Sequence, residues 1–415
     1  MKKLILSGLV LCLVVSVFAQ ESFIEQSLVI NIEVPVRVFK GDTFIPNLTL
    51  ADFELLEDGV PQKIEAVYLV KKRSIERSDE NKRFKPETGR YFFLFFEVSD
   101  YTARIGEALD YLFQDVILPG DNLFVVTPLK SYQMRKQALE LKTKEEISEE
   151  IKGVLRKDTM TGNSEYRSTV RDIATLAKSL QAAMQAGTLG TEDPEIIPAQ
   201  MDGYSSSFAG LDMDDQLVLY QALLGKLDVL RQVDQLKMLD FAKYLKMKAG
   251  QKYVFLFHQE EFVPRIEERI LSQFINEYGN RPDIVQTIMG ITDFYRRDSH
   301  LDVDLIKKSY ADSSISMHFL YITRPPQNIY GVDMESRSED IYNSFSQMAK
   351  ATGGFIESSA NPVVSFKKAV DASENYYLLY YTPKKYAGDG KFKNLQVSVK
   401  GQKYRVLHRA GYFSN

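Results

Sequence analysis

The spacing of apolar residues changes several times along the chain. Residues 28–38 alternate between apolar and polar positions, and so do residues 53–57 and 60–70, on either side of Asp58-Gly59. A period of two indicates strands with one buried face, and an Asp-Gly pair between two such runs predicts a hairpin. Similar runs return near the C-terminus at 376–382, 395–400 and 404–409. We therefore expect a small, β-sandwich-like domain formed from both ends of the mature chain, which is the chain without the N-terminal signal peptide described below.

The middle of the chain has longer apolar runs that are separated by helical patterns. Residues 91–96, 122–128, 253–257 and 315–322 are predominantly apolar, which is typical of strands covered on both faces. Helical spacing follows, for example at 102–116, and Gly353-Gly354 after 339–352 is a typical helix C-terminus. The order strand, helix, strand predicts an α/β fold with a central, mostly parallel sheet.

These patterns also predict how the chain is divided. We expect a signal peptide at 1–19 and a polar linker at 71–89. The β domain would take its first part from 24–70 and its second part from 373–413, and the α/β domain would span 90–372. Within the α/β domain we expect a helical insertion at 143–210, in which the Gly-, Ser-, Pro- and Asp-rich residues 187–210 predict a loop.

The N-terminus has the pattern of a secretory signal. Lys2 and Lys3 precede an apolar run at 4–18, and Ala19 follows where a signal peptidase reads small side chains. The run is shorter than the roughly 20 residues that span a bilayer. Cys12, the only cysteine, would leave with the signal, so the mature chain would hold no disulfide. We expect an exported protein, periplasmic or at the cell surface, with no integral membrane segment after cleavage.

Composition and motifs narrow the function classes. The chain has 52 Lys and Arg against 56 Asp and Glu, a net charge of −4, which provides no general attraction to nucleic acid. None of the four histidines lies in a pair with metal-binding spacing, and the sequence has no nucleophile elbow, P-loop or dinucleotide-binding fingerprint. We expect a protein that is not an enzyme, and these observations identify no partner.

Four stretches of the chain carry a resemblance to a known family: residues 47–64, residues 96–101, residues 249–257, and the group 349–354, 376–383 and 409–412. They resemble the von Willebrand factor type A (VWFA)-related family of exported bacterial proteins, in its acidobacterial-type branch. The resemblance covers nearly the whole mature chain. It implies a Rossmann-like VWFA domain with a central, mostly parallel sheet, and a possible metal-ion-dependent adhesion site at the carboxyl ends of the strands.

The resemblance implies that such a site holds Mg²⁺ through D-x-S-x-S after the first strand, a Thr from a second loop and an Asp from a third. Here Glu97, Ser99 and Tyr101 stand at the three positions of the first element, and Leu217 aligns with the Thr. Only Ser99 is retained, so we expect a degenerate, metal-free site and no cofactor; a functional site would use Glu97 and Ser99. The expected binding edge consists of Glu97, Ser99, Asp100, Tyr101, Leu217, His258, Gln259 and Glu260.

The function expected from these observations is a non-catalytic protein-binding module of the adhesion type. Two alternatives remain open at this point. The first is metal-dependent adhesion, or a hydrolase centre, that uses irregular carboxylate ligands at the strand ends. Carboxylates that could rescue such a site are Asp100, Asp212, Asp214, Asp215 and Glu260, and the hydrolase centre would combine Glu97, Asp100, His258 and Glu260. The second alternative is a structural factor in envelope assembly.

Overall fold

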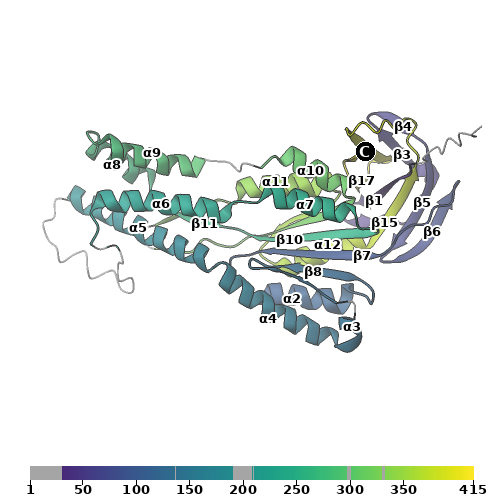
Figure 1. Ribbon diagram of the computed structural model, residues 1–415, viewed down its shortest axis with the longest axis horizontal. Coiled ribbons are helices and arrows are strands. Elements are labelled where there is room, and N and C mark those ends of the chain that lie inside the picture. The colour runs from purple at the N-terminus through teal and green to yellow at the C-terminus, as the bar shows by residue number, and fades with distance from the viewer. Residues whose placement is uncertain (1–29, 136, 190–207, 209, 297–300, 330–331) are drawn as a thin grey trace, which may run out of the picture.

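A computed structural model describes residues 30–135, 137–189, 208, 210–296, 301–329 and 332–415. The expected signal peptide at 1–19 and most of the expected loop at 187–210 lie outside the described residues. The molecule is elongated, with a β-rich unit at one end, a sheet covered by helices in the middle, and a group of helices at the other end (Figure 1).

The middle of the molecule contains a six-stranded sheet in the order β14-β12-β10-β7-β8-β9. Neighbouring strands from β14 to β8 are parallel, and only β9 pairs antiparallel. The strands are β7 (Arg90–Glu97), β8 (Asn122–Val126), β9 (Ser131–Gln133), β10 (Gln251–Gln259), β12 (Ile315–Ile322) and β14 (Ile356–Ser359).

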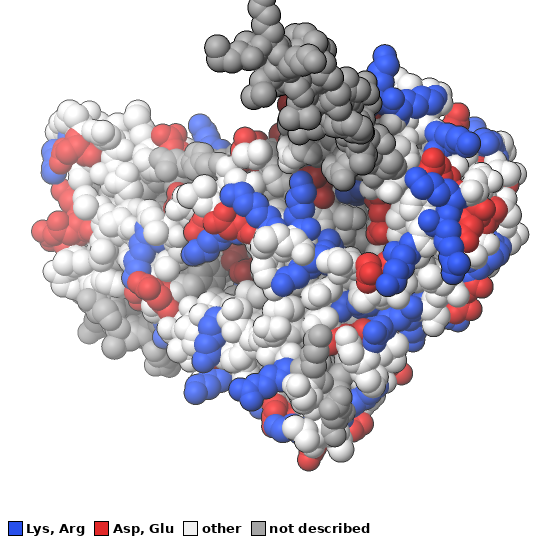
Figure 2. Space-filling model, turned by 45° about the vertical axis from the view of Figure 1, so that its right-hand side comes forward, with Lys and Arg blue, Asp and Glu red and all other residues white. Residues whose placement is uncertain are grey.

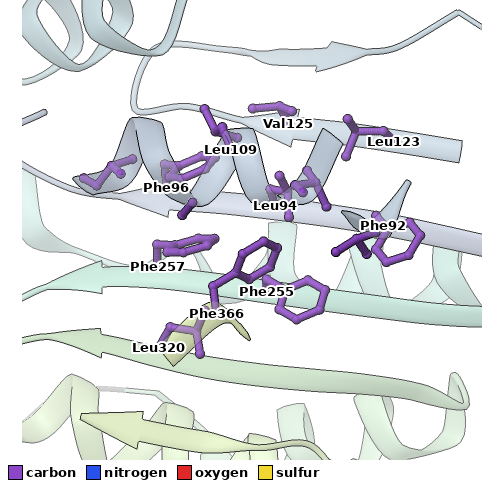
Figure 3. Close-up of a cluster of buried hydrophobic side chains, with 14 of the residues drawn as sticks. Phe92, Leu94, Phe96, Leu109, Leu123, Val125, Phe255, Phe257, Leu320 and Phe366 are labelled. Atoms are coloured by element: carbon purple, nitrogen blue, oxygen red, sulfur yellow. The ribbon is translucent and has the colours of Figure 1, made fainter. Parts of the chain in front are cut away.

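Aromatic side chains of β7 alternate between the two faces of this sheet and build a core on each. Phe92 and Phe96 pack with α2 (Ala103–Tyr111) and α12 (Pro362–Glu374) on one face, where Phe96 stacks on Phe257 at 4.8 Å between ring centroids (Figure 3). Phe93 packs on the other face against α7 (Gln235–Lys246), where it meets Phe241 edge to face at 5.4 Å. Burial on both faces explains why the strand sequences are continuously apolar.

Helices cover both faces of this sheet and also extend beyond it. One face carries α2 (Ala103–Tyr111), the π-helical turn η2 (Leu112–Val116), α3 (Ala138–Leu141), α4 (Lys144–Gly162) and α12 (Pro362–Glu374). The other carries α7 (Gln235–Lys246), α10 (Val303–Asp312) and α11 (Glu339–Ala351). The extension has its own core and consists of α5 (Ser164–Leu189), α6 (Met213–Arg231), α8 (Glu268–Glu277), α9 (Pro282–Arg296) and the ribbon of β11 (Phe262–Arg265) and β13 (Asp333–Ser336).

Both ends of the described chain join in the β-rich unit, which has two antiparallel sheets. The first runs β17-β1-β15-β5-β6, with β2 beside β1, and the second runs β18-β16-β3-β4. Their strands are β1 (Ile32–Lys40), β2 (Thr43–Phe44), β3 (Phe53–Glu57), β4 (Val60–Gln62), β5 (Ile64–Lys71), β6 (Ser74–Glu80), β15 (Asn375–Tyr381), β16 (Phe392–Val399), β17 (Arg405–His408) and β18 (Gly411–Phe413), with the 3₁₀ turn η1 (Leu50–Asp52).

Buried tyrosines connect these two sheets. The hydroxyls of Tyr381 and Tyr412 both donate to the Glu57 carboxylate, at 2.6 and 3.0 Å. Tyr377 donates to the carbonyl of Ile45 at 2.7 Å, so the tyrosines of β15 serve packing and hydrogen bonding inside this unit. The expected hairpin between β3 and β4 is confirmed, because Asp58 and Gly59 both have positive φ angles, of 47° and 79°.

The predicted fold class requires correction. The chain is a mixed α/β protein in which antiparallel pairing predominates: ten of the fourteen named strand pairs in the described residues are antiparallel. The Rossmann-like α/β class with a small added β domain is therefore wrong for this chain. The apolar runs indicated burial on both faces of the middle strands, but they carried no information on how much of the chain pairs antiparallel. Residues 71–89, expected as a linker, contain β6, which extends the first antiparallel sheet.

The β-rich unit and the middle sheet meet at the end of α11. Gly353 has φ 65°, and Gly354 N donates to Ala349 O at 2.9 Å, which confirms the predicted helix C-terminus. A Cβ atom on Gly354 would lie 1.8 Å from the carbonyl oxygen of Met317, so no larger residue fits. Ala410 N donates to Ala351 O at 2.7 Å across this junction.

A buried ion pair at the start of β7 offers a test of this architecture. Arg90 and Asp121 are 2% and 1% exposed, and Arg90 Nε donates to Asp121 Oδ1 at 3.1 Å. Asp121 also accepts from Leu118 N at 2.9 Å, which joins the turn before β8 to the start of β7. We predict that Asp121→Ala lowers the free energy of unfolding in urea by about 3–5 kcal/mol, because it leaves Arg90 buried without its counter-charge.

The matched control is Asp304→Ala, which removes an exposed carboxylate paired with Lys307 on α10. Exposed pairs contribute about 1 kcal/mol or less. Equal losses in the two variants would contradict the structural role given to the Arg90–Asp121 pair.

Candidate functional site

Three parallel strands end at the same edge of the middle sheet. In the register of the sheet, Glu97 of β7 lies beside His258 of β10, which lies beside Tyr321 of β12. The segments that follow these strands carry Ser99 and Asp100, then Glu260, and then Arg324. Polar side chains from residues far apart in sequence therefore meet at this edge.

Gln259, the last residue of β10, holds the segment after β7. Its side-chain oxygen accepts hydrogen bonds from Ser99 Oγ at 3.0 Å and from Asp100 N at 2.9 Å. Gln259 and Ser99 are 4% and 8% exposed, so both bonds lie in a buried environment. Ser99 Oγ also lies 3.4 Å from Asp100 Oδ2, so these contacts hold the segment after β7 in place.

Arg324 connects the ends of the three strands. Its Nε donates to Glu260 O at 2.7 Å, and its Nη1 donates to Asp100 Oδ2 at 2.7 Å. Its backbone N–H donates to Glu260 Oε2 at 3.1 Å. The guanidinium is thus held in one orientation from two sides, while its side chain keeps 23% exposure.

The start of α5 is attached to the same edge. Asn163, just before α5, donates through Nδ2 to Val98 O at 2.9 Å. Arg167, in the first turn of α5, donates through Nη1 to Ser99 O at 3.0 Å. These bonds give donor partners to the carbonyl groups of Val98 and Ser99, which lie just beyond the hydrogen-bonded part of β7. They also attach the start of α5 to the edge of the sheet.

A pocket of about 460 Å³ opens at this edge and continues along α5. Ser99, Asp100 and Arg324 lie at the sheet edge, and Phe262 and Met334 of the β11–β13 ribbon form part of the wall. One face of α5 forms much of the remainder, through Tyr166, Arg167, Val170, Arg171, Ala174, Thr175, Lys178, Ser179, Ala182 and Ala183. We refer to this pocket as the α5 groove.

Cations outnumber anions in the lining of the α5 groove. Arg167, Arg171, Lys178 and Arg324 are positive, and Asp100 is the one negative residue among the described residues that line it. The face seen in Figure 2 shows no comparable bias, since Lys and Arg are interspersed there with Asp and Glu. The groove therefore favours an anionic ligand over a cationic one.

The structure gathers only part of the predicted binding edge. Ser99 and Asp100 line the groove, and Gln259 and Glu260 support it through the hydrogen bonds described above. Glu97 is exposed at the end of β7 but is not part of the groove lining. His258 is 4% exposed, and its ring stacks on Tyr321 at 5.9 Å between centroids.

Two predicted residues lie elsewhere. Tyr101 turns towards α2 and α4, where Arg156 lies over its ring at 5.1 Å. Leu217 is fully buried in the core of the helical extension, because it occupies the inward face of α6. The alignment of Leu217 with a ligand-bearing loop therefore does not describe its position, although the preceding residue, Gln216, does line the groove.

The oxygen donors at this edge do not fit the Mg²⁺ site that the resemblance implies. Ser99 Oγ donates to Gln259, the Asp100 carboxylate pairs with Arg324, and neither Tyr101 nor Leu217 is directed to the site. In the described part of the chain, no three His, Cys, Asp or Glu side chains gather as a metal-binding group. Asp214, a candidate for rescue, pairs instead with Arg281 at 2.9 Å in the helical extension.

Arg324 and Arg167 were missed by the sequence reasoning, although a signal for Arg324 was present. The expected strand at 315–322 ends two residues before Arg324. Because carboxyl ends of parallel strands share an edge, the residues after that strand belonged among the candidates. No comparable signal marked Arg167, whose position depends on the direction of α5.

Comparisons with known proteins give limited information. No protein family and no curated protein matches the sequence. Among solved structures, the human COPII-coat protein Sec24c is similar with a TM-score of 0.27 and 9% identity. The match covers 80% of this chain and 44% of that chain, so this protein spans less than half the length of that relative. Similarity at this level supports no conclusion on fold or function.

The environment of Glu97 generates a prediction about pH. Desolvation raises the pKa of Glu97 above its ordinary value of 4.5, and the negative charge of Glu261 raises it further. The folded protein therefore binds this proton more tightly than the unfolded chain does. The ionised Glu97 therefore lowers the stability of the folded protein when the pH is above the folded-state pKa. This destabilisation disappears as the pH falls through that pKa towards 4.5.

We predict that Glu97→Gln increases the free energy of unfolding at pH 7, by less than about 1 kcal/mol because the side chain is exposed. The difference from the wild-type protein should vanish near pH 4, as measured by urea unfolding across that range. Glu107→Gln, an exposed change on α2, serves as control and should show no such pH dependence. A Glu97→Gln variant that is less stable than wild type at pH 7 would contradict this electrostatic account.

Proposed function

We propose that this protein is an exported, non-catalytic binding module that holds a segment of a partner protein in the α5 groove. The observation that carries this proposal is the groove itself, which opens at the joined strand ends and combines apolar side chains with cationic ones. Mixed surfaces of this kind suit a protein segment, since apolar contacts supply affinity and charges select the partner.

The arrangement around Ser99 supports a binding role. Ser99 and Asp100 are engaged in hydrogen bonds that fix the edge of the sheet, and Arg324 is fixed in turn by Asp100 and Glu260. Such an edge is pre-organised, which reduces the entropy lost when a partner binds. Preformed walls and few converging polar groups are typical of recognition sites.

The proposed location outside the cytoplasm follows from the signal-like N-terminus, which lies outside the described residues. No helix among the described residues is long and apolar enough to cross a membrane. The partner is expected in the same compartment, and the sequence and the groove do not name it.

A bulky substitution inside the groove tests the proposal. Ala182 is a half-buried lining residue on α5, and Ala182→Trp would fill the space next to it. We predict that the wild-type protein, cross-linked in the envelope fraction of its source cell, captures a partner whose recovery drops about tenfold or more with Ala182→Trp.

The matched control is Ser168→Trp, an exposed position on α5 that does not line the groove. It should capture the partner as the wild-type protein does. Recovery that is equal for both tryptophan variants, or a folded protein that captures nothing specific, would refute a binding role for the α5 groove.

A further inference from the structure

The cationic side chains of the α5 groove suggest the chemistry of its ligand. Arg167, Arg171 and Lys178 lie on one face of α5, and Arg324 stands at the sheet edge. From Arg167 to Lys178 the helix rises by about 16 Å. An extended peptide advances roughly 3.3 Å per residue, so about five residues would follow this row.

Resting on the proposed function, we propose that the ligand is an acidic, extended segment of the partner, with one carboxylate anchored by Arg324. In this arrangement Arg324 supplies, without any metal ion, the positive charge that receives the partner's carboxylate. Arg171 then receives a further acidic side chain along α5.

Hydrogen bonding at Arg324 supports its role as an anchor. Nε and Nη1 are engaged by Glu260 O and Asp100 Oδ2, which fixes the plane of the guanidinium. A fixed guanidinium presents its remaining N–H groups in a geometry that matches a carboxylate, and charge-assisted bonds of this kind are about twice as strong as neutral ones. Asp100 offsets one positive charge and leaves an excess of cations in the lining.

Arg167 contributes a positive charge that no carboxylate of the described residues pairs with. Its side chain donates hydrogen bonds to the carbonyl oxygens of Ser99, Thr159 and Met160. Its position at the base of the groove is therefore fixed by neutral acceptors, and its positive charge acts on whatever enters.

Tyr166 is a second feature that points to an anionic ligand. It lines the groove near Asp100 and Arg324, and its buried hydroxyl makes no hydrogen bond in the structure. Burial raises the pKa of this phenol above its ordinary range, and the negative charge of Glu261 raises it further. The hydroxyl therefore keeps its proton. A buried donor without an acceptor destabilises the free protein, and a ligand carboxylate beside Arg324 would supply the acceptor.

The test uses fluorescence anisotropy with a fluorescein-labelled octapeptide of glutamate, and with octapeptides of glutamine and lysine as controls. The full mature chain should bind the glutamate peptide in preference to both controls. Binding should be unchanged by EDTA and should weaken as salt is raised, because the anchor is a guanidinium exposed at the groove.

Three variants identify the anchor. Arg324→Met should weaken binding of the glutamate peptide about tenfold or more, because it removes the fixed guanidinium. Arg171→Met should weaken binding about threefold, and because this residue is exposed the change leaves the fold undisturbed. Arg269→Met, an exposed position on α8 outside the groove, is the control and should bind as wild type.

Loss of binding in EDTA, equal affinity for the glutamate and glutamine peptides, or unchanged affinity in Arg324→Met would overturn the inference. These outcomes are separable from failure of the proposed function. A partner captured through the groove by a protein that ignores the glutamate peptide leaves the function standing and removes the acidic ligand. If the protein binds the glutamate peptide but captures no partner through the groove, the acidic ligand stands and the proposed function falls.

Discussion

The candidate site depends on the side-chain oxygen of Gln259, which accepts from both Ser99 Oγ and Asp100 N. These two bonds hold the segment after β7 against the end of β10, although the residues are separated by about 160 positions in sequence. Asp100 is thereby placed where it can pair with Arg324, and Ser99 O is placed where Arg167 reaches it. Without this constraint, neither the orientation of Arg324 nor the start of the α5 groove would be defined.

The middle sheet makes that constraint possible. Stacked aromatic pairs such as Phe96–Phe257 on one face, together with Phe93 on the other, bury β7 and β10 on both sides and fix their parallel register. The carboxyl ends of both strands are then held level with each other. Because a packed interior resists displacement, the polar groups at the edge are placed by a rigid scaffold, and the groove extends from this edge along α5.

Local patterns in the sequence predicted local structure well. The alternation around Asp58-Gly59, the apolar run of β7 and the helix end at Gly353 all correspond to observed elements. Features that depend on pairing between distant segments were not predicted. The predominance of antiparallel pairing and the strand β6 inside an expected linker arise from contacts between remote segments, which periodicity does not report.

In the candidate site, too, local features were predicted and long-range ones were not. Ser99, Asp100, Gln259 and Glu260 were found because the resemblance placed the adhesion-site positions shortly after the strands expected at 91–96 and 253–257. Leu217 was misplaced because a helix position was aligned with a loop, and the apolar side chain was buried in the helical core instead. The long side chain of Arg324 extends across the edge to Asp100, and only the folded structure shows this pairing.

The Gln259 amide and the Arg324 guanidinium organise the edge at Ser99 through their hydrogen bonds to Ser99, Asp100 and Glu260. A crystal structure grown with manganese chloride and measured at the manganese absorption edge tests this most directly. The account predicts Arg324 bonded to Asp100, Gln259 bonded to Ser99, and no anomalous peak beside either pair. A peak within about 2.5 Å of the Ser99 and Asp100 oxygens, with Arg324 displaced, would contradict it.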